Sequence, residues 1–154
     1  MTPRTLYTRF ALAEVVTWAL LLLGMFLKYG THTTDLGVRV FGLLHGVVFL
    51  GYVLVTVAVW INQRWPLRTA LLALLAAVPP FLTVWAERRL ERQDLLAGDW
   101  RLGRGGDRPL TFPERVLAWA IGRPALALAA GVVAVLATTA VLLWIGPPVP
   151  SQRG

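Results

Sequence analysis

Long apolar runs separated by short polar stretches make up most of this chain. Four runs have the roughly 20 mostly apolar residues that a membrane-spanning helix needs. Basic or polar residues flank the runs, as they flank membrane helices. The pattern therefore predicts an all-α transmembrane helical bundle of four spans, at Phe10–Leu27, Val40–Ile61, Leu67–Ala86 and Pro124–Ile145.

Two of these spans allow an alternative. The third contains Pro79-Pro80, and proline inside a helix removes a backbone hydrogen bond. The pair is expected either to kink this span or to break it into a re-entrant half-helix. The first span has the basic start of a secretory signal, but its apolar run is long and no small-residue cleavage site follows. We therefore expect a retained helix.

The polar stretches suggest three regions. Residues 1–90 form a three-helix membrane core, 91–113 a polar connection rich in Arg and Gly, and 114–154 an interfacial lead-in, the fourth helix and a tail. Gly103-Arg-Gly-Gly106 lacks the preceding strand and the following Lys-Ser/Thr of a phosphate loop, so it is interpreted as a flexible segment. Phe112–Trp119 is interpreted as an amphipathic lead-in, and Gly146–Pro150 is expected to end the last helix.

Composition supports a membrane location. Hydrophobic residues make up 56% of the chain and charged residues 15%, with a mean hydropathy of +0.63. Soluble domains have about 45–50% apolar and about 25% charged residues. This argues against a soluble enzyme. The basic residues flank apolar runs instead of forming a patch, so the expected partner is the lipid bilayer and not nucleic acid. The absence of cysteine excludes disulfides, thiolate metal sites and iron–sulfur clusters.

The arginines also bear on orientation. Four spans would place both termini on one side, and seven arginines lie between Arg88 and Arg115. The positive-inside rule then favours a cytoplasmic connection and outside termini, although Arg64 and Arg68 favour the opposite. The excess of arginine over lysine is typical of a GC-rich bacterial genome. We expect a multi-pass protein of the bacterial plasma (inner) membrane.

Ionisable residues inside a span are costly and are functional candidates. With Lys28 and Arg39 taken as one interface, a rise of about 1.5 Å per residue places Glu14 and Tyr52 roughly 20 Å deep and His45 roughly 9 Å deep. We therefore predict that Glu14 hydrogen-bonds Tyr52, directly or through water, and does not touch His45. Structural alternatives are a protonated or snorkelling Glu14 and a neutral His45 bonded to a backbone carbonyl.

The second span also carries two glycines spaced for close helix packing. Gly42 and Gly46 are four residues apart beside His45, and small residues at this spacing let helix backbones approach in membranes. We interpret this face as a helix–helix contact.

The polar residues follow a familiar order. The motifs that carry a resemblance to a known family are Arg9-Phe-Ala-Leu-Ala-Glu14, the Lys28-Tyr29 that closes the first helix, the His45-Gly46 pair with Tyr52, and the proline turn in Leu75–Phe81. With these motifs, the chain resembles the YdzA-like family of small bacterial integral membrane proteins over residues 9 to 90. The resemblance implies a membrane location and no established activity. The candidate functional polar residues are Glu14, His45, Tyr52, Lys28 and Tyr29. Members usually end after three spans, so the fourth is an extension here.

Three classes of function remain open. The favoured one is a non-catalytic accessory or assembly subunit, bound to a larger membrane protein or to copies of itself. The alternative is a small proton-coupled transporter using Glu14, which is similar to the small multidrug resistance family but has a plain Ala/Leu/Val third helix. Haem would need two facing histidines, whereas a quinone contact at His45 needs only one. No metal, cofactor or enzyme activity is expected, because two histidines and one buried carboxylate supply no catalytic set.

Overall fold

The computed structural model describes residues 1–145, which are all-helical apart from turns and loops. The chain divides into two units, Met1–Arg108 and a second unit that begins at Pro109. The predicted end of the last helix at Gly146–Pro150 lies outside the described residues. The elements in chain order are α1 (Pro3–Met25), its π-helical continuation η1 (Phe26–Gly30), α2 (Leu36–Gln63), α3 (Leu67–Leu75), α4 (Leu82–Arg92), α5 (Phe112–Gly122) and α6 (Pro124–Ile145).

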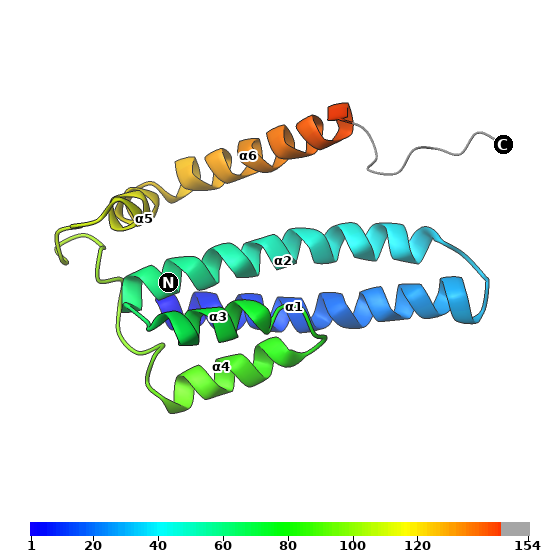
Figure 1. The fold of residues 1–154 in the computed structure, drawn as a ribbon, viewed down its shortest axis with the longest axis horizontal. Coiled ribbons are helices and arrows are strands. Elements are labelled where there is room, and N and C mark those ends of the chain that lie inside the picture. The colour runs from blue at the N-terminus through cyan, green and yellow to red at the C-terminus, as the bar shows by residue number, and fades with distance from the viewer. Residues whose placement is uncertain (146–154) are drawn as a thin grey trace. The chain divides into compact units, whose positions relative to one another are not determined.

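Two helices of the first unit have the length and composition of membrane spans. Pro3–Gly30, which is α1 with η1, and Leu36–Gln63, which is α2, are each 28 residues long. They lie antiparallel as a long hairpin (Figure 1). At about 1.5 Å per residue each is about 42 Å long, enough to cross a bilayer with its headgroups. The first two predicted spans are thus present as helices, and each extends beyond its predicted ends.

The buried faces of α1 and α2 are more polar than their outer faces. Glu14 and Thr17 of α1 and Thr56 and Asn62 of α2 are buried, whereas many leucines and valines of both helices are exposed. This distribution suits a lipid environment, where apolar side chains face outward and polar groups must find partners inside the protein.

The third predicted span is not one helix. Its residues form α3 and α4, two short helices that lie side by side as a hairpin (Figure 1). The chain reverses after Pro79-Pro80, where Phe81 takes a left-handed conformation with φ of 66°. The single continuous span at Leu67–Ala86 is therefore wrong, and the break falls at the proline pair that the alternative named.

Contacts with α1 hold α4 in its reversed direction. The Thr83 hydroxyl donates to the backbone oxygen of Ala11 at 3.2 Å, and the Thr8 hydroxyl donates to Glu87 Oε1 at 2.8 Å. One turn further, Arg4 Nη2 lies 2.7 Å from Glu91 Oε1. These contacts place the end of α4 beside the start of α1. The prediction that both termini lie outside treated Leu67–Ala86 as one membrane crossing. Because these residues form a hairpin instead, that prediction loses its support.

Residues after α4 fold onto the end of α2. Asn62 Oδ1 accepts a hydrogen bond from the Arg101 backbone at 2.9 Å, and Arg101 Nε donates to the Asn62 backbone oxygen at 2.9 Å. A Cβ on Gly106 would lie 2.1 Å from the Arg101 backbone oxygen. The segment interpreted as flexible, Gly103–Gly106, is thus a hydrogen-bonded turn that follows another at Trp100–Gly103, and Gly106 allows a close backbone approach. Residues 91–108, assigned to the connection by sequence, belong to the first unit.

The second unit contains the predicted lead-in and the fourth apolar run. Helix α5 begins with a capping box, in which the Thr111 side chain accepts from the Glu114 backbone and Glu114 Oε2 accepts from the Thr111 backbone. Helix α6 spans Pro124–Ile145, as predicted. The Phe112–Gly122 and Pro124–Ala134 helices meet at 114° and together qualify as one further span candidate. Two to three candidate spans are present among the described residues, so the prediction of four is not confirmed.

Candidate functional site

A group of polar side chains lies buried between α1 and α2. We call it the polar centre: Glu14, Thr17 and Trp18 of α1 with His45 of α2. Glu14 Oε2 lies 3.3 Å from His45 Nδ1, and Glu14 is fully buried. The Thr17 hydroxyl lies 3.2 Å from the same nitrogen, and the Trp18 and His45 ring centroids are 4.5 Å apart. Ionisable and aromatic groups thus meet within one helix–helix contact.

The contact between Glu14 and His45 overturns the sequence prediction for this region. Tyr52 does not hydrogen-bond Glu14; its hydroxyl lies 2.6 Å from that of Tyr7 and 2.9 Å from the Ala73 backbone oxygen. The error is one of register between the helices. The prediction aligned Lys28 with Arg39, whereas the structure brings position 24 against position 37, a shift of about six residues or about 9 Å.

Glycine contacts set this register. A Cβ on Gly24 would lie 2.8 Å from the Gly37 backbone carbon, and a Cβ on Gly51 would lie 2.3 Å from Phe10 Cε1. By contrast, a Cβ on Gly42 would make an ordinary 3.8 Å contact with Leu21, and one on Gly46 would meet no described atom within 4 Å. Within the described residues, the close α1–α2 approach is therefore at Gly24 and Gly51 and not at the predicted pair.

The tyrosine pair is a second buried polar group, two turns from Glu14 along α1. Tyr7 and Tyr52 are both fully buried, with ring centroids 5.5 Å apart. Because the Tyr52 hydroxyl donates to the backbone of α3 at Ala73, it leaves its lone pairs for the Tyr7 hydroxyl. The pair joins α1, α2 and α3.

The structure does not bring Lys28 and Tyr29 to the polar centre. Both lie in η1, where Lys28 Nζ is 5.2 Å from the centroid of the Tyr29 ring. Tyr29 is 63% exposed. These two residues sit where an interfacial lysine and tyrosine are common in membrane helices.

The polar centre brings a carboxyl group and an imidazole close to each other. The Thr17 hydroxyl donates to the Glu14 backbone oxygen, so its oxygen is free to accept from His45 Nδ1–H. Neither carboxylate oxygen of Glu14 receives a hydrogen bond from any described residue, and the Trp18 indole N–H is likewise buried without a partner there. A carboxyl and an imidazole at 3.3 Å can share one proton. Among residues 1–145, no three His, Asp or Glu side chains converge as a metal site would require.

Substitutions in the polar centre are expected to have opposite effects on stability. Glu14→Leu should raise the free energy of unfolding in detergent by about 1 kcal/mol, since it removes a buried carboxylate that lacks hydrogen bonds. His45→Leu should lower it by about 1–3 kcal/mol, because Glu14 then loses its nearest polar neighbour. Thermal unfolding of the purified variants measures both. Equal losses in the two variants would contradict the expected cost of burying Glu14, because they would mean that the pair is a stabilising ion pair.

Several residues of these sites were missed from sequence. Tyr7 is seven residues before Glu14, two helical turns away on the same face, and this spacing was a usable signal. Thr17 and Trp18 follow Glu14 by three and four residues, so they also lie on its face of the helix. Nothing in the sequence distinguished Gly24 and Gly51 from the other glycines, since their role depends on the register between two helices.

Comparison with known proteins agrees with a membrane domain. Residues 4–92 match the family described as Domain of unknown function (DUF3817), a range that holds α1 to α4. Over 87 residues the chain is 55% identical to "Putative membrane protein SCO5905" of Streptomyces coelicolor. The aligned segment covers 53% of this chain and 10% of that protein. This chain thus matches only a tenth of that relative's length. No solved structure matches this chain significantly.

These findings support the coarser part of the resemblance noted from sequence, a membrane protein family without an assigned activity, and the name YdzA-like stays a prediction. The family match includes both the polar centre and the tyrosine pair. Since it covers more than half of the sequence, the chain belongs to the DUF3817 family, a family of unknown function.

Proposed function

We propose that the chain is a non-catalytic accessory or assembly subunit that acts bound to a larger membrane protein. The observation that carries this proposal is the Streptomyces relative, in which the matching segment makes up only a tenth of the length. Covalent linkage gives such a segment a high effective concentration beside the rest of its chain. A domain that works beside other protein needs a surface that contacts it, and this chain is proposed to carry one.

The outer face of α2 has the properties of such a surface. Gly46 has open space above its Cα, since a Cβ there would meet no described atom within 4 Å. Its neighbours Leu43, Val47 and Leu50 are exposed. In a bilayer, helix association depends on close packing at small residues. A partner helix can approach α2 closely at Gly46, so the helix-packing role predicted from sequence becomes a contact with another protein.

Gly46→Leu is expected to abolish binding of the partner while the chain stays folded. The leucine fills open space and so strains no internal contact, but it holds a partner helix away. The measurement is affinity purification of the tagged chain from native membranes in mild detergent, with quantitative mass spectrometry of the bound proteins.

Two variants serve as controls for this experiment. Gly131→Leu also enters open space, but on α6, and Glu14→Gln changes the polar centre only; both should retain the partner. Retention of the partner by Gly46→Leu would contradict the proposed surface. Loss of a proton-driven flux in Glu14→Gln vesicles, with no partner bound to the wild type, would favour the transporter alternative instead.

We also propose a multi-pass location in the bacterial plasma membrane, with the N-terminus in the cytoplasm. The start of α1, the α2–α3 turn and the end of α4 lie at one end of the first unit, as their mutual contacts require. In the first unit, the opposite end carries only Lys28, Asp35 and Arg39 as charged residues. The positive-inside rule assigns the arginine-rich end to the cytoplasm. Its arginines include Arg4, Arg9, Arg64, Arg68, Arg88, Arg89, Arg92 and Arg101.

This orientation predicts a simple labelling result. The chain has no cysteine, so single cysteines report one position each. Thr33→Cys at the sparsely charged end should react with a membrane-impermeant thiol reagent on intact cells. Ala97→Cys at the arginine-rich end should react only after permeabilisation. Both positions are exposed, and the reverse pattern would place the N-terminus outside.

A further inference from the structure

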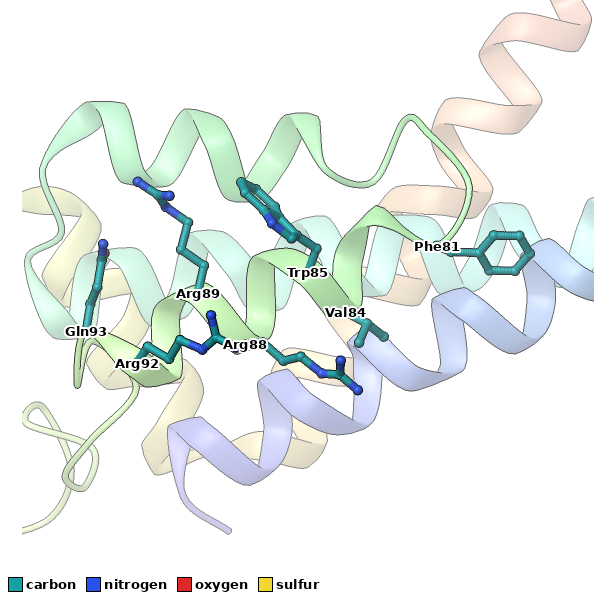
Figure 2. Close-up of a pocket in the computed structure, with 7 residues that line it drawn as sticks. All are labelled: Phe81, Val84, Trp85, Arg88, Arg89, Arg92 and Gln93. Atoms are coloured by element: carbon teal, nitrogen blue, oxygen red, sulfur yellow. The ribbon is translucent and has the colours of Figure 1, made fainter.

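The charged residues of helix α4 form two groups, one acidic and one basic. Glu87 and Glu91, four residues apart, face α1, where they bind Thr8 and Arg4. The arginines of α4 line a cavity of about 500 Å³, and Figure 2 shows Arg89 pointing away from α1. None of the described carboxylates lines this cavity. Its basic residues are Arg88, Arg89 and Arg92.

These three arginines lack anionic partners among the described residues. No ion pair joins Arg88, Arg89 or Arg92 to a carboxylate there; Arg89 instead lies 5.6 Å over the ring of Trp85. All three arginines are exposed. Guanidinium groups bind phosphate oxygens through paired hydrogen bonds. The three arginines therefore offer a cluster of hydrogen-bond donors that could bind a phosphate group.

The same cavity is apolar at its other end. Phe81, Val84 and Trp85 line it toward the start of α4, and Figure 2 shows them in sequence along the helix from the arginines. Phe81 is 46% exposed and Trp85 is 48% exposed. From Phe81 to Arg92 the helix rises by about 16 Å. One groove thus changes from apolar, at its membrane end, to strongly basic, at the arginine-rich end of the unit.

A second cavity extends the basic end toward α3. It has a volume of about 270 Å³ and shares Trp85 and Arg89 with the first. Arg68 and Thr69 of α3 also line it. A headgroup bound at Arg89 is therefore within reach of a fourth guanidinium group from a second helix.

We propose that this groove binds a phospholipid with an anionic headgroup. The phosphate lies against Arg88, Arg89 and Arg92, and the acyl chains follow Phe81, Val84 and Trp85. Charge complementarity selects the headgroup, and the apolar half selects a lipid over a soluble phosphate. Basic pockets between membrane helices on the cytoplasmic side are suited to anionic lipids. The proposal does not depend on the accessory role proposed above.

The test is native mass spectrometry of the full chain in detergent with an equal mixture of dioleoylphosphatidylglycerol and dioleoylphosphatidylcholine. The wild type is expected to retain one phosphatidylglycerol with at least tenfold preference over phosphatidylcholine. The triple variant Arg88→Gln, Arg89→Gln, Arg92→Gln should lose this preference. Because the three side chains hold no other described element in place, its thermal unfolding in phosphatidylcholine should match that of the wild type.

A charge-matched control separates a built site from general surface charge. The variant Arg104→Gln, Arg108→Gln, Arg123→Gln removes three exposed arginines outside the groove and should keep the full preference. Equal loss in both triple variants, or equal binding of the two lipids by the wild type, would overturn the proposal. Competition by glycerol phosphate at the same concentration as the lipid would also overturn it, because the apolar half would then contribute nothing.

Discussion

Gly24→Leu is expected to separate α1 from α2 and to unfold the first unit. A Cβ at this position would lie 2.8 Å from the backbone carbon of Gly37 and 2.9 Å from the backbone nitrogen of Val38. Backbone atoms cannot move aside as a flexible side chain can, so the helices must part. We expect a loss of more than about 3 kcal/mol of unfolding free energy, measured by thermal or denaturant unfolding in detergent.

The matched control is Gly46→Leu, the same substitution on the outer face of α2. Since a Cβ at Gly46 would have no described atom within 4 Å, the unfolding free energy of this variant should stay within about 0.5 kcal/mol of the wild type. Equal stability of the Gly24 and Gly46 variants would mean that the close approach of α1 to α2 is wrong. The two substitutions thus separate folding from partner binding.

Removal of the Tyr52 side chain is expected to have the next largest effect. Tyr52→Ala empties a fully buried position and should cost about 3–5 kcal/mol of unfolding free energy. Tyr52→Phe keeps the ring but leaves the Tyr7 hydroxyl and the Ala73 carbonyl without this partner. That loss should cost about 1–3 kcal/mol.

Tyr29→Phe provides the control for the hydroxyl. Tyr29 lies in η1 and is 63% exposed, so loss of its hydroxyl should change the unfolding free energy by less than about 0.5 kcal/mol. Unfolding in the same detergent gives all three values. If Tyr52→Phe were as neutral as Tyr29→Phe, the hydrogen bonds joining α1, α2 and α3 would not contribute to stability.

The sequence predicted the first two helices well because their signal is long and local. For the third run it predicted one continuous span, with a break at Pro79-Pro80 only as the alternative, because hydropathy reports composition and not direction. The reversal between α3 and α4 depends on contacts with α1. Thr83, Glu87 and Glu91 recur every four residues and all meet α1, so they form a polar stripe on one face of α4.

Two members of the polar centre, Glu14 and His45, were predicted from sequence, but their contact was not. Glu14 and His45 stood out because ionisable groups are rare in apolar helices. Their contact depended on the register of two antiparallel helices. The depth calculation aligned Lys28 with Arg39, whereas Lys28 lies in η1 and α2 already begins at Leu36. A register fixed by Gly24 against Gly37 cannot be read from the depth of interfacial residues alone.

The most direct test of the proposed accessory role is the composition of the natively expressed chain after gentle purification. The tagged wild type is extracted in mild detergent and its intact mass is measured by native mass spectrometry. A complex with a larger membrane protein in fixed stoichiometry, lost in Gly46→Leu, is the predicted result. A chain that purifies alone, or only with copies of itself, in wild type and variant alike would contradict the account.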